Sequence, residues 1–255
     1  MTDKRSSVRG WIHWLWIRVG ALAGIVFVVW SLVAYRATST AREALKSDAR
    51  VEVADRQDHW QFLPRQLTTD VGLIFVAGAL VDAAAYAPLA HAVADRGYPV
   101  LLIKLPRRGA FGGADGATPL TRAIDATLGV PAVKRWIASG HSRGGKVAAE
   151  LVRTRAGAIA GLLLIGTSHP RDFSLASISL PVTRVFGTRD TVADVEKVLD
   201  ARRNLPAGTH DIQIDGGNHS QFGYYGFQPG DWPATITREE QQRLTLDAVL
   251  SALRR

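Results

Sequence analysis

The chain contains no cysteine among its 255 residues, which excludes disulfide bridges, a thiolate nucleophile and cysteine-ligated metal centres. No group of residues has the spacing of metal ligands, and no Gly-x-Gly-x-x-Gly pattern follows an apolar run. We therefore expect neither a metal nor a cofactor. Internal repeats are also absent. The apolar fraction of 47 % is that of an ordinary globular protein with a substantial core.

The net charge of +8 is concentrated near the N-terminus. The first 50 residues hold eight basic and three acidic residues, so five of the eight excess charges flank an apolar segment. Basic residues in that position favour contact with a membrane surface. No later basic run is interleaved with aromatic residues, and we expect no nucleic-acid partner.

Residues 11–35 have the pattern of a membrane-spanning helix. Val19–Tyr35 is 17 residues without a charge, and the extension back to residue 11 is interrupted only by His13 and Arg18. About 20 apolar residues span a bilayer, and an arginine near a helix end can reach its surface. Tryptophans near both ends are typical of interfacial belts. We predict an uncleaved single-pass anchor, with a signal peptide cut near Ala37-Thr38-Ser39 as the alternative.

Basic residues are nearly equal in number on the two sides of this anchor, so their count does not set its orientation. A short basic N-terminus followed by one large domain is typical of a signal anchor, so we expect the domain outside the cytoplasm, at the cell membrane. The predicted division is residues 1–44 for the basic segment, anchor and connector, and residues 45–255 for the domain.

Beyond residue 50, short apolar runs alternate with helical patterns. Residues 51–53 and 60–62 alternate apolar with polar side chains, as a half-exposed antiparallel pair does. Continuous apolar runs, typical of strands buried on both faces, lie at 71–76, 100–103, 160–165 and 182–186, with a last strand at 211–214. A capping box at 237–240 opens the final helix. The alternation predicts an α/β fold with a mostly parallel sheet flanked by helices.

The segment Gly140-His141-Ser142-Arg143-Gly144-Gly145 is the most informative stretch of the chain. It follows the apolar run at 136–138 and precedes a helical pattern at 146–152. Gly-x-Ser-x-Gly between a strand and a helix predicts a nucleophile elbow, in which the serine hydroxyl stands above the sheet on a strained turn. Gly140 and Gly144 are needed because strand and helix cross too closely for side chains. We expect the His141 side chain to point away from the site.

Three further segments accompany the elbow: Gly78-Ala79-Leu80-Val81-Asp82, Gly187-Thr188-Arg189-Asp190 and Gly217-Asn218-His219. With them, residues 45–255 resemble the α/β-hydrolases, and within these the small bacterial membrane-anchored esterases of the dienelactone-hydrolase-like kind. The resemblance implies the α/β-hydrolase fold, preceded here by one transmembrane helix. It also implies a catalytic triad in the chain order serine, acid, histidine.

That order assigns Ser142 as nucleophile, Asp190 as acid and His219 as base. Asp190 follows a buried strand at the edge where open α/β sheets form their sites, although an aspartate there also caps a following helix well. Asp172 is the main competitor for the acid. His169 also follows a strand, but it precedes Asp190 and breaks the order.

The oxyanion of the tetrahedral intermediate needs backbone N–H donors. The resemblance implies the N–H of Arg143, next to the nucleophile, and one in the turn after strand 71–76, for which we choose Ala79, with Leu80 as the alternative. Ala77-Gly78 stands where related hydrolases have His-Gly. The Arg143 side chain either attracts an anionic substrate group or is a solvated arginine at a helix start, and a Ser142–Lys146 dyad has no support.

These assignments predict a membrane-anchored serine hydrolase that cleaves a small ester-like molecule, a carboxylic ester, through an acyl-enzyme. The segment 166–180, where such enzymes often insert a lid, has only 15 residues, which predicts an open site. The alternative is a non-catalytic binding or scaffold protein that keeps the hydrolase fold at the membrane.

Overall fold

The computed structural model describes residues 4–255, with side chains described from Gly10 onward except that of Ala156. Residues 1–3 of the predicted N-terminal segment lie outside the described residues. Eight strands form one sheet in the order β1-β2-β4-β3-β5-β6-β7-β8. Their bounds are β1 Val51–Asp55, β2 His59–Pro64, β3 Val71–Val76, β4 Val100–Ile103, β5 Arg135–His141, β6 Ile159–Ile165, β7 Val182–Gly187 and β8 His210–Ile214.

The sheet is mostly parallel, as the sequence predicts. Strand β2 pairs antiparallel with both β1 and β4, and the five pairings from β4 through β8 are parallel. Every residue of β3 and of β4 is buried. Because helices cover both faces of such strands, both side-chain rows are apolar, which is why these two strands begin and end where the sequence predicts.

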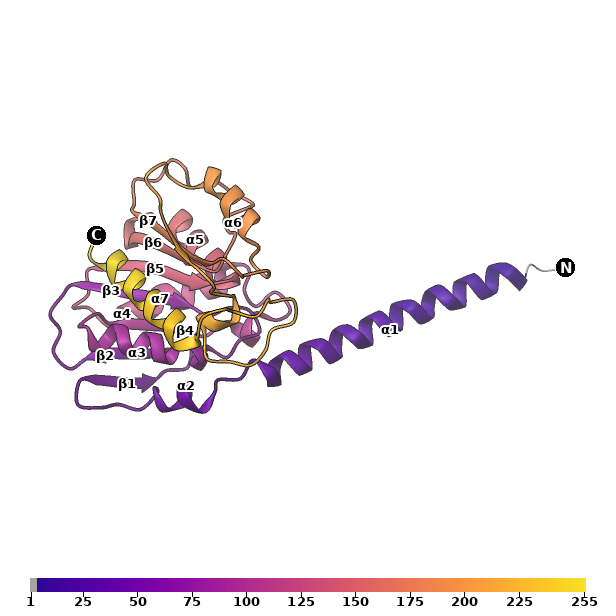
Figure 1. The fold of residues 1–255 in the computed structure, drawn as a ribbon, viewed down its shortest axis with the longest axis horizontal. Coiled ribbons are helices and arrows are strands. Elements are labelled where there is room, and N and C mark those ends of the chain that lie inside the picture. The colour runs from indigo at the N-terminus through magenta and orange to yellow at the C-terminus, as the bar shows by residue number, and fades with distance from the viewer. Residues whose placement is uncertain (1–3) are drawn as a thin grey trace.

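Helices pack on both faces of the sheet (Figure 1). Leu73 and Phe75 of β3 share one core with helices α3 and α7, and Ile74 and Val76 share the other with α4 and α5. This alternation is the two-residue period of a strand. The helices are α3 Ala87–Asp95, α4 Ala117–Leu128, α5 Arg143–Thr154, α6 Val195–Asp200 and α7 Arg238–Leu253, with 3-10 turns η1 Ala83–Tyr86, η2 Pro106–Gly109, η3 Ala156–Ala158, η4 Ala201–Asn204 and η5 Ser220–Phe222.

Helix α1 (Lys4–Ala34) projects away from the domain as a single rod (Figure 1). Its segment Gly10–Ala34 is 25 residues long and contains an 18-residue window with a mean hydropathy of 2.2, so by length and composition it can cross a membrane. The Arg18 guanidinium lies 3.4 Å from the centre of the Trp14 ring, which partners the one charged side chain of the segment.

The connector after α1 is packed against the domain. Tyr35, Ala37 and Ala41 are buried, the last of them in the short helix α2 (Ser39–Glu43). The Thr38 N–H donates to the Tyr224 carbonyl at 2.9 Å, and the Asp82 N–H donates to the Tyr35 carbonyl at 2.9 Å. The boundary between residues 44 and 45 remains a prediction, but these contacts mean that the connector is not a free linker.

Candidate active site

Ser142 occupies the turn between β5 and α5, with φ of 55° and ψ of −121°. A side chain at positive φ is strained, and here the strain turns the chain sharply from strand to helix. A Cβ on Gly140 would lie 2.3 Å from the Gly144 carbonyl oxygen, and one on Gly144 would lie 2.2 Å from the Val76 carbonyl oxygen. Only glycine fits at either position, so the local geometry is that of the predicted elbow.

His219 and Asp190 meet as a buried pair. The Nδ1 atom of His219 lies 2.8 Å from Oδ2 of Asp190, and both side chains are almost fully buried. The other carboxylate oxygen of Asp190 accepts the backbone N–H groups of Val192 at 3.0 Å and Ala193 at 2.7 Å. The carboxylate is therefore fixed in orientation, with one oxygen left for the imidazole.

Ser142 lies beside this pair. It is half-buried and lines a small cavity of about 160 Å³ together with Val192 and Ala193, the residues that hold Asp190. Within residues 4–255 the Ser142 hydroxyl makes no hydrogen bond to His219. Such bonds are often long in unliganded hydrolases and tighten when substrate binds, so the arrangement stays compatible with proton transfer between the two.

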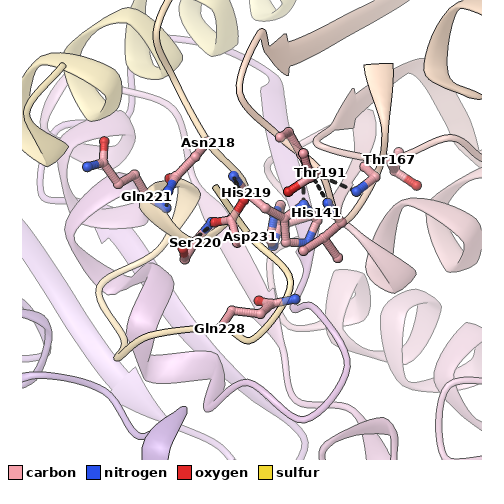
Figure 2. Close-up of polar contacts among 12 residues, drawn as sticks. His141, Thr167, Thr191, Asn218, His219, Ser220, Gln221, Gln228 and Asp231 are labelled. Atoms are coloured by element: carbon pink, nitrogen blue, oxygen red, sulfur yellow. Dashed lines mark hydrogen bonds and ion pairs between the residues drawn. The ribbon is translucent and has the colours of Figure 1, made fainter. Parts of the chain in front are cut away.

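The expectation that His141 points away from the site is wrong. Its ring centre lies 4.4 Å from that of His219, and Figure 2 shows the two residues next to each other. The Gly78 N–H donates to the Tyr86 hydroxyl at 3.2 Å, and that hydroxyl lies 2.8 Å from Nδ1 of His141. The Tyr86 hydroxyl has one O–H and two lone pairs, so it can hold the Gly78 N–H and Nδ1 of His141 at the same time.

The buried His141 ring is neutral near pH 7, whichever of its two nitrogens carries the proton. Complete burial lowers its pKa well below the ordinary value, and the nearby His219 lowers it further. A neutral neighbour does not repel the positive charge that His219 would gain as a base. The His141 ring contacts His219 because Tyr86, 55 residues away in sequence, binds it from the inner side. No local sequence pattern predicts this long-range bond.

The candidate oxyanion donors differ in whether their backbone N–H groups already bind an acceptor. The Leu80 N–H donates to the Arg108 carbonyl and the Gly78 N–H to Tyr86, so neither is available. Within the described residues, the N–H groups of Ala79 and Arg143 have no acceptor. Of the two candidates in the turn after β3, the geometry thus favours Ala79 over Leu80.

The loop that carries His219 is held by two residues that sequence reasoning missed. Asp231 accepts the backbone N–H groups of His219 at 3.1 Å and Ser220 at 2.8 Å (Figure 2). Gln241 of α7 accepts the Asn218 N–H at 3.0 Å and donates to the Asn218 carbonyl at 2.7 Å. Only the burial of a glutamine on the final helix could have suggested this clamp, and burial is invisible in the sequence.

The competing candidates have other partners. Asp172 is exposed and makes no hydrogen bond to a histidine within the described residues. His169 lines the same cavity as Ser142, but its Nε2 accepts from Arg171 at 3.3 Å. Lys146 and the Arg143 side chain both bind Asp115, at 2.9 and 2.5 Å, so Lys146 is not paired with Ser142. The segment 166–180 carries no lid helix.

Several solved structures resemble this one in fold. A bacterial membrane phospholipase A is 14 % identical with a TM-score of 0.59 over 96 % of this chain and 99 % of its own. A predicted CIB-like hydrolase from Thermoplasma acidophilum is 15 % identical with a TM-score of 0.59 over 79 % and 98 %. A dienelactone hydrolase from Anabaena variabilis is 15 % identical with a TM-score of 0.58 over 80 % and 99 %. At these identities the similarity shows the fold alone.

No curated protein sequence matches the chain. Residues 72–243, about two thirds of its length, match the Alpha/beta hydrolase family. This stretch begins in β3 and ends in α7, so it contains the elbow serine and the buried histidine–aspartate pair. The chain is therefore a member of the Alpha/beta hydrolase family.

Proposed function

We propose that the protein is a serine hydrolase that cleaves a carboxylic ester through an acyl-enzyme. The observation that carries the proposal is the buried His219–Asp190 pair, 2.8 Å apart, next to a serine on a strained strand-to-helix turn. A serine hydroxyl needs a base to become nucleophilic, and the base needs an oriented acid. The fixed carboxylate of Asp190 meets the second requirement.

In the proposed reaction the Ser142 Oγ attacks the ester carbonyl carbon while its proton moves to Nε2 of His219. The N–H groups of Arg143 and Ala79 bind the oxyanion. The intermediate collapses, and the leaving alcohol takes the proton from His219, which leaves Ser142 acylated. Water then attacks the acyl group with His219 as base, releasing the acid. Asp190 stays ionised and stabilises the imidazolium.

We further propose that α1 anchors the domain to the cell membrane, with the domain outside the cytoplasm. The apolar length of Gly10–Ala34 supports the anchor, as does the fold similarity to a membrane phospholipase A over nearly the whole chain. If the segment spans a bilayer, the full chain stays in the membrane through salt and alkaline carbonate washes. Release by salt alone contradicts the anchor, because screening removes only electrostatic binding. Protease added to intact cells tests the sidedness, since it digests an external domain and spares a cytoplasmic one.

A fluorophosphonate probe tests the catalytic assignment. It should label the full-length protein, and Ser142→Ala should abolish labelling. Ser168→Ala is the matched control, because Ser168 lines the same cavity and its loss should leave labelling intact. Turnover of a p-nitrophenyl ester should fall with labelling. A folded wild-type protein that neither labels nor hydrolyses any ester would support the non-catalytic alternative.

A further inference from the structure

Three large aromatic side chains are exposed on loops at one end of the domain. Phe111 is 77 % exposed, Phe227 is 67 % exposed and Trp232 is 58 % exposed. They are the only exposed phenylalanine or tryptophan side chains outside α1 among those that the structure describes. Phe111 lies after β4, and the other two lie after β8, so all three are at the carboxyl edge of the sheet where Ser142 stands. We name them the aromatic rim.

Two residues of the aromatic rim, Phe111 and Phe227, belong to loops that contact the end of the predicted membrane span. The N–H of Gly226, the residue before Phe227, donates to the Ala34 carbonyl at 3.1 Å. The Arg108 guanidinium, three residues before Phe111, donates to the Leu32 carbonyl at 2.8 Å. Phe227 is thus adjacent to a residue bonded to the helix end, and Phe111 is three residues from another. Figure 1 shows α1 leaving the domain beside the loop that follows β8.

Contacts from several loops hold the junction between α1 and the domain. Tyr35 packs edge-on against Tyr225 with ring centres 5.6 Å apart, next to the Gly226–Ala34 bond. On the other side, Arg108 also pairs with Asp82 at 3.3 Å. Since bonds from two different loops fix the last turn of α1, the domain does not swing freely on the helix. A helix that spans the bilayer therefore places these loops at the lipid surface.

The charged residues at the junction between α1 and the domain also favour contact with lipid. Arg36, two residues past the end of α1, and Arg107, next to the bonded Arg108, are both exposed. Arginines at this depth meet lipid phosphates, while exposed aromatic rings favour the interfacial layer just below them. The loops involved also support the site: the Leu80 N–H, next to Ala79, donates to the Arg108 carbonyl.

We propose that the aromatic rim enters the interfacial layer of the bilayer and that the substrate of the Ser142 site is an acyl ester dissolved in the membrane. The substrate part rests on the proposed hydrolase function, whereas the lipid contact rests on the proposed anchor. The cavity that Ser142 lines is open and lies at the edge that carries the rim. We therefore place the entry of the ester at this edge of the sheet.

The lipid contact can be tested without activity, because the chain has no cysteine of its own. Single cysteines at positions 111, 227 and 128 are labelled with bimane in the full-length protein in phosphatidylcholine–phosphatidylglycerol vesicles containing doxyl-labelled lipid. Leu128 is the control, since it is 74 % exposed but ends α4 at the opposite edge of the sheet. We expect strong quenching for Phe111→Cys and Phe227→Cys and none for Leu128→Cys. Unquenched probes at both rim positions overturn the proposal.

The substrate part is tested with Phe111→Ser/Phe227→Ser against Leu128→Ser. For a long-chain ester in vesicles the double variant should lose about tenfold or more in kcat/KM, because two phenylalanines no longer partition into lipid. A short soluble ester should be hydrolysed as before by both variants, which also shows that they fold. Equal loss on both esters overturns the lipid substrate. Quenching at the rim without hydrolysis of any ester refutes the proposed function and leaves the lipid contact standing.

Discussion

Asp190→Asn is expected to trap His219 in the wrong tautomer. An asparagine has one acceptor oxygen, and the N–H groups of Val192 and Ala193, at 3.0 and 2.7 Å, hold that oxygen where Oδ1 is now. The amide NH₂ then faces Nδ1 of His219, where the carboxylate oxygen lies at 2.8 Å. Because the amide only donates there, the ring proton moves to Nε2. A protonated Nε2 cannot accept the proton of Ser142.

The expected loss of kcat in Asp190→Asn follows because His219 no longer acts as a base while the side chains keep their positions. A wrong tautomer in a serine triad lowers kcat by about 10⁴-fold, which corresponds to about 5.4 kcal/mol of barrier. Steady-state hydrolysis of a p-nitrophenyl ester in detergent measures it directly. The side chain keeps its volume and its two backbone bonds, so the melting temperature should change by less than about 4 °C, or about 1 kcal/mol.

Asp172→Asn is the matched control, since Asp172 was the other candidate acid and is exposed. It should retain activity within about twofold, as surface changes away from a site usually do. Less than a tenfold loss in Asp190→Asn, or a larger loss in Asp172→Asn, refutes the tautomer argument and the choice of acid.

Three further changes address stability. Tyr86→Phe leaves the Gly78 N–H and Nδ1 of His141 without a hydrogen-bond partner, and each loss costs about 1–3 kcal/mol of stability. Calorimetry should therefore show a melting temperature lower by about 5–15 °C. A shift as small as that of the control Tyr98→Phe, at a half-buried tyrosine, contradicts the two hydrogen bonds. Burial and the neighbouring Arg171 and Arg143 lower the pKa of His169 from 6.5 to about 4, so the unfolded chain binds more protons between these pH values and stability falls as pH drops through that window. His169→Gln should flatten this dependence of the melting temperature, and an unchanged slope refutes it. Removing residues 1–30 should leave a folded, soluble enzyme. Removing residues 1–44 also strips the buried Tyr35, Ala37 and Ala41, so this shorter protein should melt about 5 °C or more below the first. Equal melting temperatures would mean that the connector does not stabilise the domain.

The central strands and the elbow could be predicted from the sequence because their signals are local. Strand β3 is covered on both faces, so its six residues form one apolar run whose ends are visible in the sequence. The elbow needs glycines at fixed spacing around Ser142, and the crossing of β5 and α5 enforces that spacing whatever the rest of the chain does. The order of strands and helices then fixed the α/β class.

The start of helix α6 could not be predicted, because the Asp190 carboxylate binds both His219 and the backbone before the helix. An aspartate at position 190 suits the cap of a helix that follows at once, but α6 begins only at Val195. The Asp190 carboxylate takes the N–H groups of Val192 and Ala193 into a turn, and Asp194, at φ of 44°, caps the helix after it. The apolar pattern continues across this turn, and so it could not reveal the delay.

The partners of the site residues were decided only by the tertiary structure. Tyr86 meets His141 from 55 positions away, Gln241 reaches Asn218 from 23, and Tyr35 packs on Tyr225 across most of the chain. Each contact depends on which loops the strand order 4-3-5-6-7-8 brings to the same edge of the sheet. Periodicity reports which face of its own element a side chain occupies, but it carries no information on what a distant segment presents to that face.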